Sequence, residues 1–186
     1  MKLNKMYTGV LAFGLALVLA QQANAQFGRT KSKADLSQAA TASQTIGVDT
    51  EISISYHRPG VKGRDIWGTN LAAYDKPWRA GANETTKITF SANVKVNGKS
   101  IAAGSYGFFI IPKASGAWTV IVNKDWETWG HFAYKEAQDV VRFEVTPEDA
   151  PHQEWLRYGF DDLKADSATA FMHWEKKKIS FSIETD

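Results

Sequence analysis

The chain lacks cysteine entirely and has little net charge. The absence of cysteine from its 186 residues excludes disulfide bonds, thiolate catalysis, thiolate metal sites and a cysteine-linked lipid anchor. The formal net charge is +2, and Lys2 and Lys5 of the N-terminal segment supply this excess. Because the remainder is neutral, we expect neither nucleic-acid binding nor electrostatic binding to a membrane surface, both of which need a basic excess.

Long hydrophobic runs are also scarce. The one clear run, Thr8–Ala20, follows a short basic head and precedes the small residues Ala23 and Ala25. This pattern is typical of a secretory signal peptide over residues 1–25, since the run is shorter than the roughly 20 residues that a spanning helix needs. We therefore expect an exported protein, periplasmic or secreted, with no membrane insertion after signal cleavage.

The rest of the sequence predicts a β fold. Residues 26–39 are polar and lack periodicity, which indicates a flexible lead-in, and residues 40–186 are predicted to form a single domain. Apolar residues alternate with polar ones in many segments, such as Ile52, Ile54 and Tyr56, and turn signals separate these segments. About nine strands result, so the predicted fold class is all-β, an antiparallel β-sandwich.

Two connections between the predicted strands are unusually long. One covers about residues 58–85 and the other covers residues 124–138, and both are rich in aromatic residues. Long connections in a compact domain are commonly functional, and aromatic side chains stabilise only when they pack. We therefore expect two long ordered loops. Trp118, Trp155 and Trp174 lie in strand patterns and are predicted to be core residues.

Several short motifs, in order, resemble a known family. The resemblance rests on Tyr56–Pro59, Val61–Gly68, Trp78–Glu84, Ala103–Gly107, Ile111–Pro112, Trp129–Gly130, Glu154–Leu156, Phe160–Leu163, Ser167–Thr169 and Trp174–Glu175. The chain is similar over roughly residues 40–183 to exported bacterial proteins catalogued as domain of unknown function 2911. The resemblance implies export and a compact, mostly β domain. It implies no established activity and assigns no catalytic residues.

The two long loops hold the candidate ligand-binding residues. Arginine suits bidentate capture of an anion, and tryptophan can stack on a sugar or a guanidinium. We expect a site for a saccharide, an anionic small molecule or an envelope component. Its candidate residues are Arg58, Lys62, Arg64, Trp67, Trp78, Arg79, Asn83, Glu84, Trp126 and Trp129. The alternative is internal: the arginines pair with Asp65, Glu84 or loop carbonyls, and the tryptophans pack beneath the loops.

The sequence leaves enzymatic activity open, but it contains no recognisable catalytic motif and so favours a protein that is not an enzyme. The four histidines have no close metal-ligand spacing, and no nucleophile elbow or phosphate-binding loop is present, so we expect no metal and no cofactor. The alternative functions are a glycan hydrolase that uses carboxylates such as Glu84, Asp125 or Glu127, and a structural envelope protein without a small ligand.

One stability prediction follows for the first loop. If Arg58 and Arg79 converge with Glu84 and Asp65 in a buried ion network, Arg79→Ala belongs to the strongly destabilising class, at about 3–5 kcal/mol.

Overall fold

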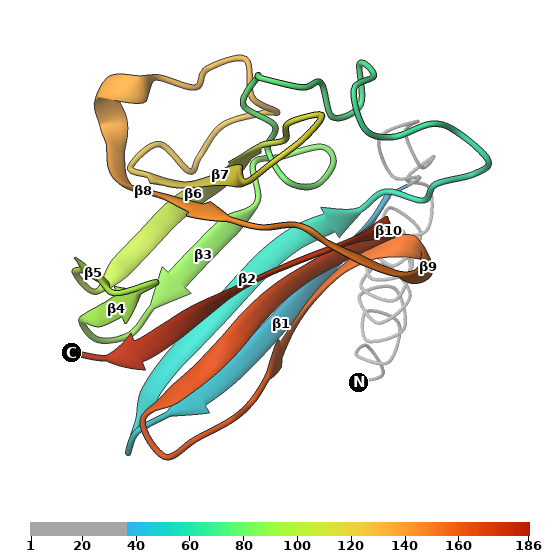
Figure 1. Cartoon of the computed structure of the whole chain (residues 1–186). Helices are drawn as coiled ribbons and strands as arrows, with labels where there is room; N and C mark the ends of the chain where they lie inside the picture. The colour runs from blue at the N-terminus through green and yellow to red at the C-terminus, as the bar shows by residue number, and fades with distance from the viewer. Residues whose placement is uncertain (1–36) are drawn as a thin grey trace, which may run out of the picture. The chain divides into compact units, whose positions relative to one another are not determined.

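Ten strands of residues 37–186, the part of the chain that the computed structural model describes, form two antiparallel sheets (Figure 1). Their bounds are β1 (Gln38–Ile46), β2 (Thr50–Arg58), β3 (Lys87–Phe90), β4 (Val94–Val96), β5 (Lys99–Ile101), β6 (Gly104–Ile111), β7 (Trp118–Asn123), β8 (Asp139–Val145), β9 (Glu148–Asp161) and β10 (Ser167–Thr185). A short 3-10 helix, η2 (Glu136–Gln138), precedes β8. The predicted signal peptide, 1–25, and most of the predicted lead-in lie outside the described residues.

The predicted β-sandwich is confirmed. One sheet has six strands in the order β1-β2-β3-β6-β7-β8, and the other has four in the order β5-β4-β10-β9. β1 starts at Gln38, inside the segment predicted as lead-in, and pairs with the whole of β2. Within residues 37–186 no helix has the length and apolar character needed to cross a membrane.

The core lies between the two sheets and follows the predicted alternation. Ile52, Ile54 and Tyr56 of β2 are buried, while the residues between them are partly exposed. This period of two sends successive side chains to opposite faces of a strand. The inward-facing side chains form the core. The outward-facing side chains of the six-stranded sheet are only partly buried and can contact the loops or a ligand.

Four tryptophans form one cluster in this core. The Trp67 ring lies 4.6 Å from that of Trp118, and Trp78 stacks on Trp174 at 5.6 Å. The predicted core positions of Trp118 and Trp174 are confirmed, since each is at most 2% exposed. The prediction for Trp155 is wrong: it lies on the edge strand β9 and is 38% exposed.

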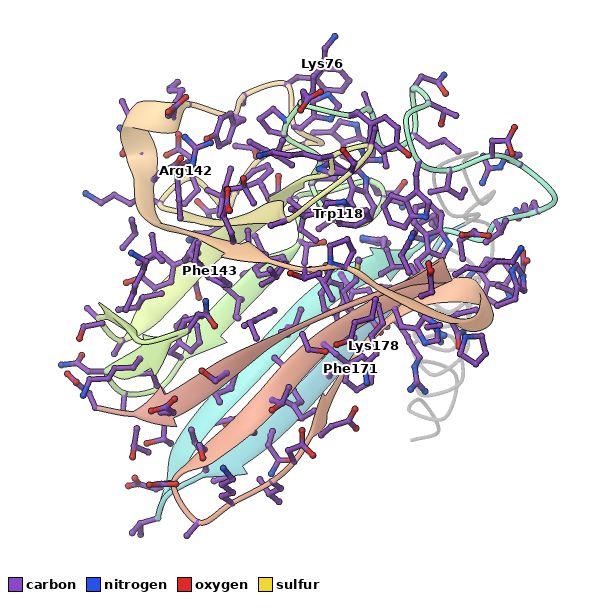
Figure 2. The ribbon with its side chains drawn as sticks, in the orientation of Figure 1. Lys76, Trp118, Arg142, Phe143, Phe171 and Lys178 are labelled. Atoms are coloured by element: carbon purple, nitrogen blue, oxygen red, sulfur yellow. The ribbon has the colours of Figure 1, made fainter. Side chains whose placement is uncertain are left out.

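The outer face of the four-stranded sheet is closed by charged side chains. Phe171 of β10 is buried although its neighbours Ala170 and Met172 face the other sheet. The Lys178 ammonium lies 4.4 Å from the Phe171 ring centroid, and the Arg157 guanidinium lies 5.0 Å from it. Lys178 and Phe171 are neighbours in Figure 2. Cation–π contacts and aliphatic stems thus cover this ring.

The two long loops lie at the same end of the sandwich (Figure 1). One joins β2 to β3, and the other joins β7 to β8. The ends of both loops agree closely with those of the two predicted connections. Because all four strands that carry them belong to the six-stranded sheet, with β6 between β3 and β7, the loops can meet above its outer face.

Candidate functional site

A row of small or polar residues crosses the outer face of the six-stranded sheet. Strand register places Thr41 opposite Ser55, Ser55 opposite Lys87, Lys87 opposite Gly107, and Gly107 opposite Asn123. These residues alternate with the core residues of their strands, so they share the outward face. We call this row the floor, because the two long loops can form the sides of a groove above it.

The second loop folds back over this floor at Gly107. A Cβ atom at this glycine would lie 2.6 Å from the Asp125 carbonyl oxygen, so the close approach requires glycine. The buried Asn123 fixes the loop at both ends: its Oδ1 accepts from Asp125 N–H at 2.8 Å, and its Nδ2 donates to the Lys135 carbonyl at 3.0 Å. The segment 126–129 is thereby held above the sheet.

The two long loops are hydrogen-bonded to each other. Thr85 N–H donates to the Thr128 carbonyl at 3.0 Å, and Gly130 N–H donates to the Asn83 carbonyl at 3.0 Å. The Thr85 hydroxyl donates to the Gly130 carbonyl at 2.8 Å. Residues 83–85 and 128–130 therefore form one short antiparallel ribbon, in which Glu84 and Trp129 are paired by an isolated β-bridge.

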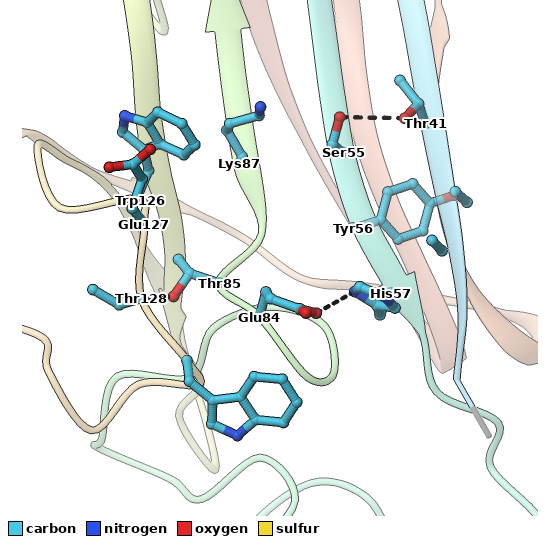
Figure 3. A pocket seen from close by; sticks show the side chains of 13 residues that line it. Thr41, Ser55, Tyr56, His57, Glu84, Thr85, Lys87, Trp126, Glu127 and Thr128 are labelled. Atoms are coloured by element: carbon cyan, nitrogen blue, oxygen red, sulfur yellow. Dashed lines mark hydrogen bonds and ion pairs between the residues drawn. The ribbon is translucent and has the colours of Figure 1, made fainter. Parts of the chain in front are cut away.

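Floor and loops together enclose a groove of about 720 Å³ (Figure 3). Its size falls within the range of small-molecule sites, roughly 300–1,000 Å³. It is lined from three strands and both loops by Ala39, Ala40, Thr41, Ser55, Tyr56, His57, Glu84, Thr85, Lys87, Trp126, Glu127, Thr128 and Trp129.

Three polar contacts fix the side chains of the groove. His57 Nδ1 lies 3.1 Å from Glu84 Oε2, and the Thr41 and Ser55 hydroxyls lie 3.2 Å apart. Both pairs are drawn with dashed lines in Figure 3. On the loop side, the Lys87 ammonium lies 4.7 Å from the centroid of the Trp126 ring. These contacts leave the second carboxylate oxygen of Glu84 and the carboxylate of Glu127 as acceptors beside the groove.

Trp129 is the exposed aromatic surface of the groove. It is 54% exposed although its backbone is fixed by the bridge to Glu84. A large exposed ring on an ordered backbone is a ready contact surface, because its position is set before a ligand arrives. Trp126 contributes a second, half-buried ring.

The charges lining the groove are mixed. Glu84 and Glu127 are acidic, Lys87 is basic, and His57 contacts Glu84. The described residues contain no group of three His, Asp or Glu side chains arranged to hold a metal ion. The arrangement thus supplies hydrogen-bond acceptors, hydroxyls and aromatic faces.

Three of the ten residues predicted from the sequence line this groove, namely Glu84, Trp126 and Trp129. Trp67 and Trp78 lie in the tryptophan cluster of the core, where they stabilise the loop from below. Asn83 lies in the ribbon that joins the loops and also donates to the Ser37 carbonyl. The interpretation of Trp67 and Trp78 as packing residues is therefore the one that the structure supports.

The first loop uses its cations internally. Arg58 Nε donates to the Leu156 carbonyl at 3.0 Å, and Arg64 donates to the Val61 and Gly60 carbonyls at 3.0 and 2.6 Å. Lys62 lies outside the groove, with its ammonium 5.6 Å from the Trp155 ring centroid. A loop with many backbone acceptors requires such partners.

The expected ion network around Arg79 is not found among the described residues. Glu84 pairs with His57 instead, and none of the ion pairs of residues 37–186 includes Arg58, Arg79 or Asp65. Arg79 is half-buried, and its Nε is buried without a hydrogen-bond partner.

Sequence reasoning missed the strand side of the groove. His57, Thr41, Ser55 and Lys87 come from β1, β2 and β3, and their alternation with core residues was the available signal. That signal identifies an outward face but does not show which outward residues a loop will cover.

Comparison with known families now adds one finding. The family model described as "Protein of unknown function (DUF2911)" matches residues 37–183. The chain belongs to this family. The matched region of the DUF2911 domain contains every residue that lines the groove. No curated protein and no solved structure matches the chain.

Proposed function

We propose that this DUF2911 domain binds a carbohydrate in the groove between β1–β3 and the two long loops. The observation that carries the proposal is the exposed ring of Trp129, held on a fixed backbone beside carboxylates and hydroxyls. Sugars present C–H faces that pack on aromatic rings, and their hydroxyls donate to carboxylates. The groove offers both kinds of contact within one volume.

A neutral or weakly charged sugar fits the groove better than an anion does. The groups that line the groove include two carboxylates, Glu84 and Glu127, but only one lysine, Lys87. The Lys87 ammonium already lies over the Trp126 ring. An anionic ligand would therefore meet more negative than positive charge. The carboxylates instead suit the hydroxyl groups of a polyol.

The predicted signal peptide supports export as part of the same proposal. An exported domain would meet glycans of the cell envelope or of the surroundings. Binding to such material needs no metal or cofactor in the groove, in keeping with the expectation from the sequence.

A comparison of two tryptophans tests the proposal. We expect a glycan array probed with the full chain to yield a binding saccharide, and isothermal titration calorimetry to give its affinity. Trp129→Ala should weaken this affinity at least about tenfold, because it removes the stacking surface. Trp155→Ala is the matched control, since Trp155 is also exposed but lies outside the groove. Loss of affinity in both variants, or in neither, would contradict the proposal.

Hydrolysis of the bound glycan is the second candidate, favoured by the presence of Glu84 and Glu127 in one groove. Glycosidases use two carboxyl groups on either side of the scissile bond. A hydrolase would release reducing ends from the bound saccharide, and both Glu84→Gln and Glu127→Gln would abolish this release. A binding protein would leave the saccharide intact.

A further inference from the structure

Glu84 and Trp129 lie directly opposite each other in the ribbon that joins the two loops. They form an antiparallel β-bridge, and both side chains line the groove. Side chains opposite each other in an antiparallel pair project from the same face, with Cβ atoms about 4.5–5.5 Å apart. The bonds of Thr85 and Gly130 fix this backbone. A carboxylate and an aromatic ring are therefore held side by side at the groove.

The Glu84 carboxylate is accessible and only partly used. His57 Nδ1 lies 3.1 Å from Oε2, a pair drawn with a dashed line in Figure 3. Among residues 37–186, the other oxygen, Oε1, has no hydrogen-bond or ion-pair partner. The Glu84 side chain is 57% exposed, and Trp129 is 54% exposed. A ligand entering the groove can therefore reach both groups.

Elsewhere in the fold, a carboxylate and a ring together hold an ammonium group. The Lys178 Nζ atom lies 2.8 Å from Asp161 Oδ2 and 4.4 Å from the centroid of the Phe171 ring. The ring face and the carboxylate both attract a positive charge, so the two contacts support each other. Glu84 and Trp129 provide the same two groups at the groove.

No cation of the described chain occupies the ring of Trp129. The cation–π contacts of residues 37–186 involve Trp126, Trp155 and Phe171, and none involves Trp129. The neighbouring lysine of the groove, Lys87, lies over Trp126 instead. The ring and the carboxylate thus form a cation site that the described residues leave to a ligand.

The charges at the groove also favour a positively charged ligand. Its lining includes the carboxylates of Glu84 and Glu127 but only the ammonium of Lys87. Glu127 is exposed, and its carboxylate has no ion-pair partner among residues 37–186. A ligand with one ammonium group would balance the two carboxylates.

We infer that the groove recognises an amino sugar, a saccharide unit whose amino group is free and protonated. The inference rests on the proposed carbohydrate function and narrows it to a class of sugar. The ammonium group lies over the Trp129 ring and donates to Glu84 Oε1, while the sugar hydroxyls contact the other polar groups of the groove. Acetylation of the amine removes its charge, so the acetylated sugar loses both contacts of the cation.

Three β-1,4-linked tetrasaccharides that differ only at carbon 2 test the inference. The glucose oligomer carries a hydroxyl there, the glucosamine oligomer an ammonium, and the N-acetylglucosamine oligomer a neutral amide. Each is titrated into the full chain by calorimetry, at a pH below the pKa of the sugar amine. We expect the glucosamine oligomer to bind at least about fivefold more tightly than either neutral oligomer, from one ion pair and one cation–π contact.

The outcomes separate this inference from the proposed function. Equal affinities, or binding confined to neutral saccharides here and on the glycan array, would overturn the inference and leave the carbohydrate site in place. Absence of binding to any saccharide would overturn both.

Glu84→Gln tests the role of the carboxylate. The amide keeps the size of the side chain but not its charge, so the ratio of the affinities for the glucosamine and glucose oligomers should fall at least about threefold. Because both affinities are measured on the same variant, damage to the fold affects them alike. Glu144→Gln is the matched control: its carboxylate is 64% exposed and lies outside the groove, and its ratio should stay unchanged. An unchanged ratio in Glu84→Gln, or an equal fall in Glu144→Gln, would overturn the inference.

Discussion

Thr85 and Thr128 join the two long loops through backbone and side chain together. The backbone bond from Thr85 N–H to the Thr128 carbonyl is 3.0 Å long, and their hydroxyls lie 2.7 Å apart. The Thr85 side chain is 5% exposed, so these bonds form in a nearly dry environment. The contact fixes the loop wall that carries Trp129 relative to the strands that form the floor.

Thr85→Val should therefore damage both stability and the groove. Valine keeps the shape but leaves the Gly130 carbonyl without its hydroxyl donor. An unsatisfied buried acceptor costs about 1–3 kcal/mol, which denaturant unfolding would measure. Thr41→Val is the control, since Thr41 is exposed and should change stability by less than about 0.5 kcal/mol. Equal losses of unfolding free energy in both variants would show that the hydrogen bonds between the loops do not stabilise the protein.

Gly107→Ala should displace the second loop. The new Cβ would meet the Asp125 carbonyl at 2.6 Å, and neither the β6 backbone nor the Asn123-anchored loop can easily move. Overpacking of this kind costs about 1–3 kcal/mol. The indole signal of Trp126 in NMR spectra should shift with the loop. An unperturbed spectrum and unchanged stability would contradict the close approach.

Arg79→Met should cost less than about 1 kcal/mol, or should stabilise the protein. The sequence suggested a loss of about 3–5 kcal/mol for Arg79→Ala, which requires a buried ion network around Arg79. The Arg79 Nε is instead buried without a hydrogen-bond partner, and replacing the guanidinium with an apolar side chain relieves the cost of this desolvation. Denaturant unfolding decides between the two. A loss above about 3 kcal/mol would show that the guanidinium has a structural partner.

Tyr158→Phe should reduce the loss of stability at high pH. Burial, with a smaller effect of Tyr56, raises the pKa of Tyr158 well above its usual value near 10. A raised pKa contributes stability that is present below the unfolded-state value and is lost as the pH rises through the folded-state value. The natural protein should therefore lose unfolding free energy above about pH 10, more steeply than the phenylalanine variant.

This variant also has an expected cost at neutral pH. The Tyr158 hydroxyl donates to the Ala80 carbonyl, which keeps a second donor in Thr86. The loss should be about 0.5–1.5 kcal/mol, the usual contribution of one hydrogen bond. Parallel pH profiles for the two proteins would show that Tyr158 does not titrate with unfolding.

The sequence predicted the fold well because the core needs a simple pattern. The alternation of Ile52, Ile54 and Tyr56 is required for one buried face, and the predicted loop limits coincide with the ends of β2 and β7. Trp155 was placed wrongly because it was grouped with Tyr158, which lies three residues later and therefore on the opposite face of β9. The buried residues of this stretch are Leu156 and Tyr158, while Trp155 is exposed.

The groove was only partly predictable. Trp126, Trp129 and Glu84, which line the groove, were among the candidates because aromatic and acidic residues stand out in long loops. His57, Ser55 and Lys87 were missed, because strand register brings them under a loop that follows some 40 to 70 residues later. Arg58 and Arg64 donate to backbone carbonyls, as the internal alternative expected; the sequence left both alternatives open, because the positions of the carbonyls are set only in the folded chain.

The most direct test of the central claim is an NMR titration of the seven tryptophan indole signals with the saccharide that the array identifies. Assignment by single Trp→Phe variants gives each ring its own signal. We expect the signals of Trp129 and Trp126 to shift saturably, because both rings line the groove. Those of the core residues Trp67, Trp78, Trp118 and Trp174 should stay in place. Saturable shifts at Trp155 with none at Trp129 would contradict a carbohydrate site in this groove.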